Sequence, residues 1–244
     1  MRAILFVLLL CPVGRPALVA RTETPAAPLA ISDADEIRAG AVLAAKFEAV
    51  NGLAPTPQVK KIDRYLQRVG DLVASHARRR LPYRFRFDPD PSFKSAVALP
   101  GGQIFVGGGI LAYIDTEDQL AAVLGHEIEH VDLGQCRDRL VQEMSARHLS
   151  ASDLNHLGLD VFLSSYGHDR EFAADREGVR LSMEAGYSAN AAVRLLQTFV
   201  ILGQQMPNTA SEARSNLEAR IAQIRSLAES QKPSPGERPL ALPE

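Results

Sequence analysis

A capped helical segment that ends in two histidines constrains this sequence more than any other feature. Thr116 and Gln119 form a Thr-x-x-Gln capping box, which is a typical start of an α-helix. The apolar run at 121–124 leads directly into His126 and His130. The sequence therefore predicts one packed helix that runs from Thr116 into this histidine pair.

The spacing of the two histidines indicates a metal site. Residues four apart on a helix project from the same face, so His126 and His130 can share one tetrahedral metal ion. Glu127 lies about 100° round the helix from His126, where it reaches a water on the metal without binding the metal itself. The pattern His-Glu-x-x-His thus predicts two zinc ligands and one general base, with Glu129 solvated or supporting a ligand. The alternative is a chance pair of histidines on a core-facing helix without metal.

Catalytic zinc keeps three protein ligands and one open position, so a third ligand is expected. Cys136 stands where the metzincin pattern places that ligand, but the helix-breaking glycine of the pattern falls at Leu133, and a free cysteine on a helix usually packs in the core. Glu171 and Asp175 lie four apart, so that one can bind zinc while the other orients a histidine. Spacing alone leaves other acids open as well, namely Asp153, Asp160, Asp169 and Glu177.

Two further helices are predicted before the motif. Asp33 and Glu36 form a capping box for a helix that stops near Asn51. Thr56 precedes a second helix that runs toward the basic cluster at 78–80. Its apolar residues recur at helical spacing, which predicts one buried face made of Val59, Ile62, Leu66, Val69 and Val73.

Short strands are predicted between these helices and the motif. Strict alternation at 83–87 indicates a half-buried strand, and two apolar runs at 95–99 and 103–106 are joined through the turn residues 100–102. After the motif the signals are helical, with starts near Ser152 and Ser188 and a last amphipathic segment at 211–227. The fold class is therefore α+β: a mainly helical domain with a small antiparallel sheet beside the helix of His126 and His130.

The N-terminus predicts export. Arg2, the apolar run at 3–11 and the small residues at 17–20 are typical of a cleaved secretory signal, too short to span a bilayer. We therefore expect a periplasmic or secreted protein without an integral membrane segment, although peripheral association with the envelope stays open. A lipid anchor on Cys11 is disfavoured because Leu10 is bulky.

Composition narrows the function classes. Hydrophobic residues make up 46% of the chain, which excludes a disordered protein. Lys and Arg total 27 against 29 for Asp and Glu, so the basic excess of nucleic-acid binders is absent and no nucleic-acid partner is expected.

Four motifs in order resemble one peptidase group. They are Leu99-Pro100-Gly101-Gly102, Gly125-His126-Glu127-Ile128-Glu129-His130, Glu171-Phe172-Ala173-Ala174-Asp175-Arg176 and Ala185-Gly186-Tyr187. Over about residues 57–227 the sequence is similar to the HtpX-like and CAAX-prenyl-protease-type zinc metallopeptidases, specifically to their soluble periplasmic branch. The resemblance implies a zincin-like domain that holds one Zn²⁺ per chain.

The same resemblance implies roles for individual residues. The glutamate of the Glu-x-x-x-Asp motif is the third zinc ligand in that group, which corresponds to Glu171, and the aspartate supports the site, which corresponds to Asp175. The strand at 103–106 resembles the edge that binds extended peptides in such enzymes. The chain divides into a signal peptide at 1–20, a linker at 21–32, a zinc metallopeptidase domain at 33–230 and a disordered tail at 231–244.

The sequence also departs from the group at three positions. Gln135 stands where many members have a histidine five residues after the second ligand, and Ser95 stands where an asparagine precedes the Pro-Gly-Gly turn. In the C-terminal His-Pro-x-x-x-x-Arg element, Arg220 matches the arginine but Arg214 replaces the histidine. Arg220 and Arg214 are therefore expected to serve in oxyanion binding or gating, together with the alternatives Tyr166 and His168.

These expectations add up to a zinc-dependent metalloendopeptidase with polypeptide substrates. Glu127 would activate the water on zinc, and the resemblance implies envelope or misfolded proteins as substrates. The alternative is a zinc-containing, chaperone-like binding module of the cell envelope that does not cut. The remaining histidines are expected at the surface or in packing, namely His76, His148 and His156.

Overall fold

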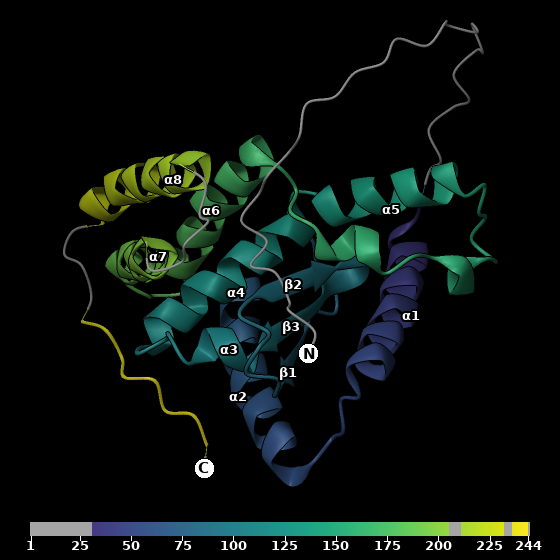
Figure 1. Ribbon diagram of the computed structural model, residues 1–244, viewed down its shortest axis with the longest axis horizontal. Coiled ribbons are helices and arrows are strands. Elements are labelled where there is room, and N and C mark those ends of the chain that lie inside the picture. The colour runs from purple at the N-terminus through teal and green to yellow at the C-terminus, as the bar shows by residue number, and fades with distance from the viewer. Residues whose placement is uncertain (1–30, 205–210, 232–235, 244) are drawn as a thin grey trace, which may run out of the picture.

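The computed structural model describes residues 31–204, 211–231 and 236–243 (Figure 1), and of residues 203, 204 and 211–215 only the helical backbone. The predicted signal peptide and residues 21–30 of the predicted linker lie outside this range. The helices are α1 (Asp33–Asn51), α2 (Pro57–Ala74), α3 (Gly108–Leu111), α4 (Glu117–Asp132), α5 (Gln135–Ala146), α6 (His168–Glu184), α7 (Ala189–Gln204) and α8 (Ser211–Ser230). The strands are β1 (Arg84–Asp88), β2 (Ala96–Leu99) and β3 (Gln103–Gly107), and short 3-10 turns are η1 (Pro100–Gly102), η2 (Leu154–His156) and η3 (Asp160–Leu163).

The three strands form one mixed sheet in the order β1-β3-β2. The mainly helical α+β prediction is confirmed, but the sheet is not purely antiparallel. β2 and β3 form the expected antiparallel pair across η1, whereas β3 enters between its two predecessors and pairs parallel with β1. Strand periodicity specifies which face is buried but not the order of strands, so the sequence could not show this insertion.

Because β3 is central, the predicted peptide-binding edge at 103–106 is wrong. Both sides of β3 are hydrogen-bonded to neighbours, and all five of its residues are buried. The edge strand that contacts α4 is β2. Any extended peptide that adds to this side of the sheet would therefore pair with residues 96–99.

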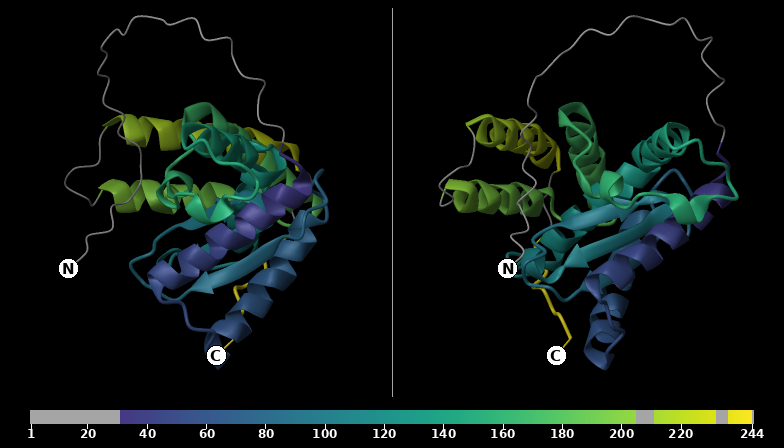
Figure 2. Two further views of the ribbon diagram at one scale, coloured as in Figure 1. Left: turned by 90° about the vertical axis from the view of Figure 1, so that its right-hand side faces the viewer. Right: turned by 45° about the vertical axis from the view of Figure 1, so that its right-hand side comes forward.

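Alternation along β3 divides the core between the two faces of the sheet. Ile104 and Val106 pack with α2 and α4, whereas Phe105 packs with α1 and α5. A third apolar cluster joins α4 and α6 to the helix pair α7 and α8, which lies away from the sheet (Figure 2). Helix α4 thus contacts the sheet on one side and the C-terminal helices on the other.

Helix starts follow local capping chemistry. The Thr116 hydroxyl accepts a hydrogen bond from the Gln119 N–H, and the Gln119 side-chain oxygen accepts one from the Thr116 N–H. The predicted capping box is therefore confirmed. Helix α1 is capped by Ser32 rather than Asp33. The helix predicted near Ser152 is wrong, because the side chains of this serine-rich segment bond to the local backbone and two 3-10 turns form instead.

The predicted disordered tail is wrong for residues 236–243, here called the C-terminal strap. Its backbone pairs with the start of α4: Glu117 N–H donates to the Arg238 carbonyl, and Leu240 N–H donates to the Asp115 carbonyl. The Asp118 carboxylate accepts from Arg238 N–H at 2.8 Å. Proline content indicates a lack of regular structure, which does not exclude an extended segment held by other elements.

A close crossing of α4 and α6 fixes the centre of the molecule. A Cβ at Gly125 would lie 2.5 Å from the Gly178 carbonyl oxygen, and a Cβ at Gly178 would lie 2.6 Å from His126 N. Ser182 Oγ also donates to the Ala121 carbonyl across the contact. The two helix backbones therefore touch beside His126. Within the described residues, none of the helices is both long enough and apolar enough to cross a membrane.

Candidate metal centre

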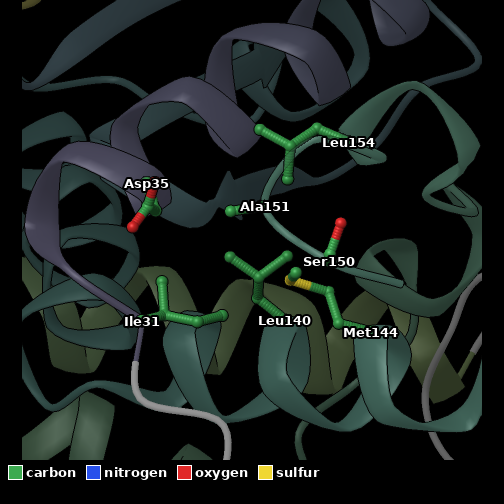
Figure 3. Close-up of a pocket in the computed structure, with 7 residues that line it drawn as sticks. All are labelled: Ile31, Asp35, Leu140, Met144, Ser150, Ala151 and Leu154. Carbon is green, nitrogen blue, oxygen red and sulfur yellow. The ribbon is translucent and has the colours of Figure 1, made fainter. Parts of the chain in front are cut away.

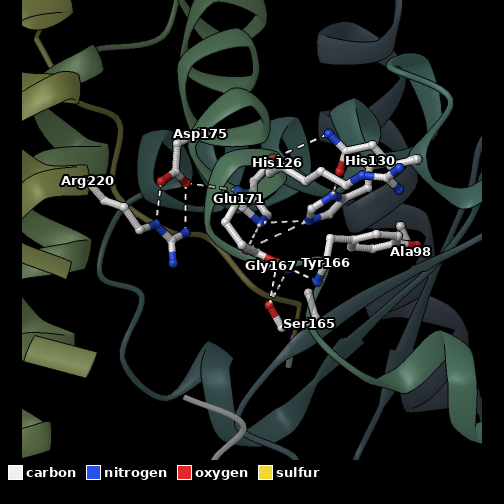
Figure 4. Close-up of polar contacts among 12 residues, drawn as sticks. Ala98, His126, His130, Ser165, Tyr166, Gly167, Glu171, Asp175 and Arg220 are labelled. Atoms are coloured by element: carbon white, nitrogen blue, oxygen red, sulfur yellow. Dashed lines mark hydrogen bonds and ion pairs between the residues drawn. The ribbon is translucent and has the colours of Figure 1, made fainter. Parts of the chain in front are cut away.

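Three donor atoms from α4 and α6 converge beside this crossing (Figure 4). His126 Nε2 lies 3.0 Å from His130 Nε2 and 3.4 Å from Glu171 Oε2, and His130 Nε2 lies 4.0 Å from that oxygen. Tetrahedral ligands about 2.1 Å from a zinc ion would be about 3.4 Å apart. Two imidazole nitrogens and one carboxylate oxygen at this spacing fit a catalytic zinc ion.

His126 is oriented from behind by Asp175. The Asp175 carboxylate lies 2.9 Å from His126 Nδ1, so it accepts the Nδ1 hydrogen and turns Nε2 toward the centre. Arg220 on α8 donates to both oxygens of Asp175. The structure thus places Asp175 where the sequence predicted a supporting acid, with Arg220 behind it.

His130 is held by groups on α5 and on the loop before α6. Its Nδ1 lies 2.7 Å from Gln135 Oε1, and the Tyr166 ring stacks on the imidazole with centroids 4.3 Å apart. The sequence marked Gln135 only as a departure from the family pattern. Its position five residues after His130, just beyond a glycine, is the one local signal that could have indicated this contact.

Glu171 has one oxygen satisfied and one directed to the histidines. Its Oε1 accepts from Ser165 Oγ at 2.9 Å and from Tyr166 N–H at 3.1 Å. Its Oε2 faces His126 and His130. The side chain is therefore prearranged to bind a metal through a single oxygen. No spacing rule in the sequence points to Ser165, which the fold alone brings into contact.

The protonation of the two histidines reflects their closeness. Burial lowers the pKa of His126, but hydrogen bonds to Asp175 and Glu171 outweigh it and raise that pKa to about 10. Burial and the neighbouring charge of His126 lower the pKa of His130 to about 3. Without a metal, His126 therefore carries a hydrogen on both ring nitrogens and His130 is neutral, and a divalent cation would displace the extra proton on His126 Nε2.

Glu127 lies buried beside the donor atoms without belonging to the cluster. Burial raises the pKa of its carboxyl to about 7, partly offset by the charge of His126 and by a hydrogen bond from the Ala98 backbone. Since Ala98 belongs to β2, the edge strand holds this carboxylate in place. A carboxyl with a pKa near neutrality can both accept and return a proton.

The remaining candidates lie elsewhere or have other partners. Cys136 is fully buried and shares a contact of 3.1 Å with the Tyr166 hydroxyl, and burial raises the pKa of its thiol to about 12. His168 stacks on Phe172 at the surface. Arg214 is on α8, but its side chain lies outside the described residues. The other acids lie at caps, at the surface or in ion pairs: Asp153, Asp160, Asp169 and Glu177.

The prediction of a solvated Glu129 is wrong. Only 1% of this residue is exposed, and its Oε2 has no hydrogen-bond partner among the described residues. Arg78 Nη2 lies 3.8 Å away. Burial, together with the neighbouring charge of Asp132, raises the pKa of Glu129 to about 8. Its charged neighbours are Asp132, Arg78, Glu177 and Arg180, none of which belongs to the metal cluster.

A separate cavity of about 170 Å³ lies between α1, α5 and the loop after α5 (Figure 3). Its lining is mainly apolar, and none of its residues belongs to the cluster around His126. The donor atoms, rather than this cavity, therefore mark the candidate site. The lining residues are Ile31, Asp35, Leu140, Met144, Ser150, Ala151 and Leu154.

Comparisons with known proteins agree with this geometry. The model of peptidase family M48 matches residues 60–230, a range that contains His126, Glu127, His130 and Glu171. The chain is also 35% identical over 118 residues to the mitochondrial metalloendopeptidase OMA1 of Schizosaccharomyces pombe, a match that covers 44% of this chain and 34% of that protein. The chain thus corresponds to about a third of the length of this relative. With the family model spanning most of the sequence and the whole donor cluster inside it, the chain belongs to peptidase family M48, a family of zinc metallopeptidases.

Proposed function

We propose that this chain is a zinc-dependent endopeptidase whose centre is formed by His126, His130 and Glu171. One observation carries the proposal: three donor atoms at zinc spacing lie beside Glu127, a buried carboxylate with a pKa near 7. A structural zinc site closes four protein ligands around the metal. Among the described residues three groups form this cluster, which leaves a position for water and substrate.

Each residue has a defined part in peptide hydrolysis. Zinc, when bound, lowers the pKa of water and polarises the scissile carbonyl. Glu127 accepts the proton of the attacking water and then delivers it to the leaving amine. Asp175 and Arg220 keep the His126 ring in one orientation, so that the donor set does not have to reorganise during the reaction.

The substrate would bind in extended form along β2, because this strand is the edge beside Glu127. Main-chain pairing at a sheet edge gives affinity with little sequence preference. At Ala98 the backbone already bonds to Glu127 and to the Cys136 thiol. Pairing would therefore use the Ala96 end of the strand. This arrangement favours unfolded polypeptides over folded proteins.

The cellular setting is part of the proposal. The signal-like residues 1–20 support export to the periplasm or beyond, where misfolded envelope proteins would be the substrates. Arg214 stays a proposed oxyanion or gating residue. Arg220 has less freedom for that role, because it donates two hydrogen bonds to Asp175.

Zinc analysis combined with cleavage of casein tests the proposal. We expect about one zinc per chain and cleavage by the wild type. Glu127→Gln should retain zinc and lose cleavage by at least about 1,000-fold, because the proton carrier is removed. Glu129→Gln is the matched control, since it removes a buried carboxylate two residues away whose charged neighbours lie outside the cluster, and it should cleave normally.

The ligand assignment has its own test. His126→Ala and Glu171→Ala should lower zinc content well below one per chain, because each removes one of three donors. Full turnover by Glu127→Gln would refute the mechanism. Zinc without any cleavage by the wild type would favour the non-cutting binding module, and a wild type without zinc would refute the metal centre.

A further inference from the structure

We propose that Gln135 is a positioning residue that fixes the tautomer of His130 and ties α6 to the metal centre. The inference rests on the proposed function, since it concerns how the same site is held. Gln135 is the first residue of α5, and only 5% of it is exposed. Its side chain contacts two of the segments that supply donor atoms.

The hydrogen-bond partners of Gln135 determine how its amide is turned. Its Nε2 lies 3.3 Å from the Arg170 carbonyl oxygen, which can only accept, so the amide NH₂ must point there. The amide oxygen then faces His130 Nδ1 at 2.7 Å. Because an amide oxygen is only an acceptor, Nδ1 must carry the hydrogen. The Nε2 lone pair of His130 is thereby left for the metal.

The contact also links ligand-bearing elements across the site. Arg170 directly precedes Glu171, so one glutamine side chain bonds a histidine of α4 and the backbone beside the acid of α6. Gly134, with a φ of 74°, turns the chain so that Gln135 faces back toward α4. A substitution of Gln135 would therefore remove the hydrogen bonds to the His130 ring and to the first turn of α6 together.

The side chain that orients His130 is neutral, whereas the one that orients His126 is charged. His126 is held by the Asp175–Arg220 ion pair, whereas His130 is held by a neutral amide and a stacked tyrosine ring. Burying a second carboxylate here would place a further negative charge next to Glu171. A neutral acceptor orients His130 without that cost.

The test compares zinc affinity in full-length variants, measured by competition with a chromogenic zinc chelator. Gln135→Met keeps the side-chain length and removes both hydrogen bonds, and we expect zinc binding to weaken about 10- to 100-fold. Gln135→Glu keeps an acceptor for Nδ1 but loses the donor to the Arg170 carbonyl and adds a charge beside Glu171, so it should restore the Nδ1–H of His130 and only part of the zinc affinity. The matched control is Gln67→Leu, which removes another bridging amide, between Tyr83 O and Phe85 N, that contacts none of the site residues.

A spectroscopic measurement reads the tautomer directly. In ¹⁵N NMR spectra of the imidazoles, the wild type should show a slowly exchanging Nδ1–H on His130, both with zinc and after chelation. Gln135→Met should lose this protected hydrogen, while Gln67→Leu should keep it together with wild-type zinc affinity. A merely structural role would lower thermal stability in both variants without changing the tautomer.

Two outcomes would overturn the inference. One is a Gln135→Met protein with unchanged zinc affinity and an unchanged Nδ1–H signal. The other is an equal loss of zinc affinity in Gln67→Leu, which would indicate general destabilisation. Failure of the proposed function looks different: the wild type itself would bind no zinc or cleave nothing, and the tautomer of His130 would still report on Gln135 without metal.

Discussion

Glu129, next to the candidate ligand His130, affects the pH dependence of folding stability. It lies on α4, the helix that carries His126 and His130, and its carboxyl is buried. Among the described residues its Oε2 has no hydrogen-bond partner, and the pKa of the carboxyl is raised from 4.5 to about 8. The folded state therefore holds this proton over a pH range in which the unfolded chain releases it. Stability contributed by the group falls as the pH rises from about 4.5 to about 8.

Replacing Glu129 should make this pH dependence visible. Glu129→Gln removes the ionisable group, so we expect the variant to be about 2–4 kcal/mol more stable than the wild type at pH 8.5, with little difference at pH 5. Urea unfolding of both proteins, zinc-loaded at each pH, measures the difference. An equal gain at the two pH values would mean that ionisation of Glu129 is not the cause.

At this scale the sequence predicted the candidate ligands better than the residues that support them. The two histidines and Glu127 follow from helical spacing alone, whereas Glu171 was one of several acids until the family resemblance singled it out. Gln135 and Ser165 could not be predicted, because their roles depend on contacts between separate elements of the fold. Local patterns do not encode which elements meet.

At the scale of elements, the crossing of α4 and α6 decides the geometry of the centre. Two glycines, Gly125 and Gly178, let the helix backbones touch, and that contact places Glu171 and Asp175 opposite His126. The hydrophobic pattern of either helix would look the same with alanine at these two positions. The sequence therefore predicted helical structure around both glycines, but neither the start of α6 at His168 nor the closeness of the two helices.

Gly178→Ala should separate the two helices. The added Cβ would lie 2.6 Å from backbone atoms of Gly125 and His126, which cannot move aside as a side chain can. We expect zinc affinity to fall at least about tenfold, because the donor atoms are drawn apart. Chelator competition measures the affinity.

Gly70→Ala is the control for this prediction. Its Cβ would lie 2.3 Å from the Phe85 ring, a comparable clash between α2 and β1 that is remote from the metal centre. This variant should lose thermal stability and keep its zinc affinity. Equal zinc affinities in Gly178→Ala and the wild type would show that the crossing does not set the donor spacing.

At the scale of the whole molecule, helical and strand periodicity was sufficient to predict the fold class. It was not sufficient to predict contacts between segments that lie far apart in the sequence. The C-terminal strap contacts residues far back in the chain, among them Tyr65, whose hydroxyl accepts from Ala241 N–H across 176 positions. A proline-rich segment without periodicity gives no sign of such partners. Strand order and the position of the strap both depend on packing that forms only in the complete domain.

Removing the strap should weaken the fold without disturbing the metal. A chain truncated after Gln231 loses the pairing with Asp115 and Glu117 and the packing of Leu240 and Leu242. We expect a loss of about 2–5 kcal/mol in unfolding free energy, while zinc content stays near one per chain. Calorimetry and metal analysis check both parts. Arg238→Ala should show a smaller loss of the same kind, and an unchanged melting temperature in the truncated chain would contradict the assignment.

The strap also bears on the order in which the molecule is completed during translation. Residues 236–243 leave the ribosome after every other described element, yet the Glu117 N–H in the first turn of α4 has its acceptor in Arg238. Domains generally form as the chain emerges from its N-terminus. Here the helix that carries His126 and His130 is synthesised near the middle of the chain, but its opening turn obtains its last partner only when residue 238 arrives.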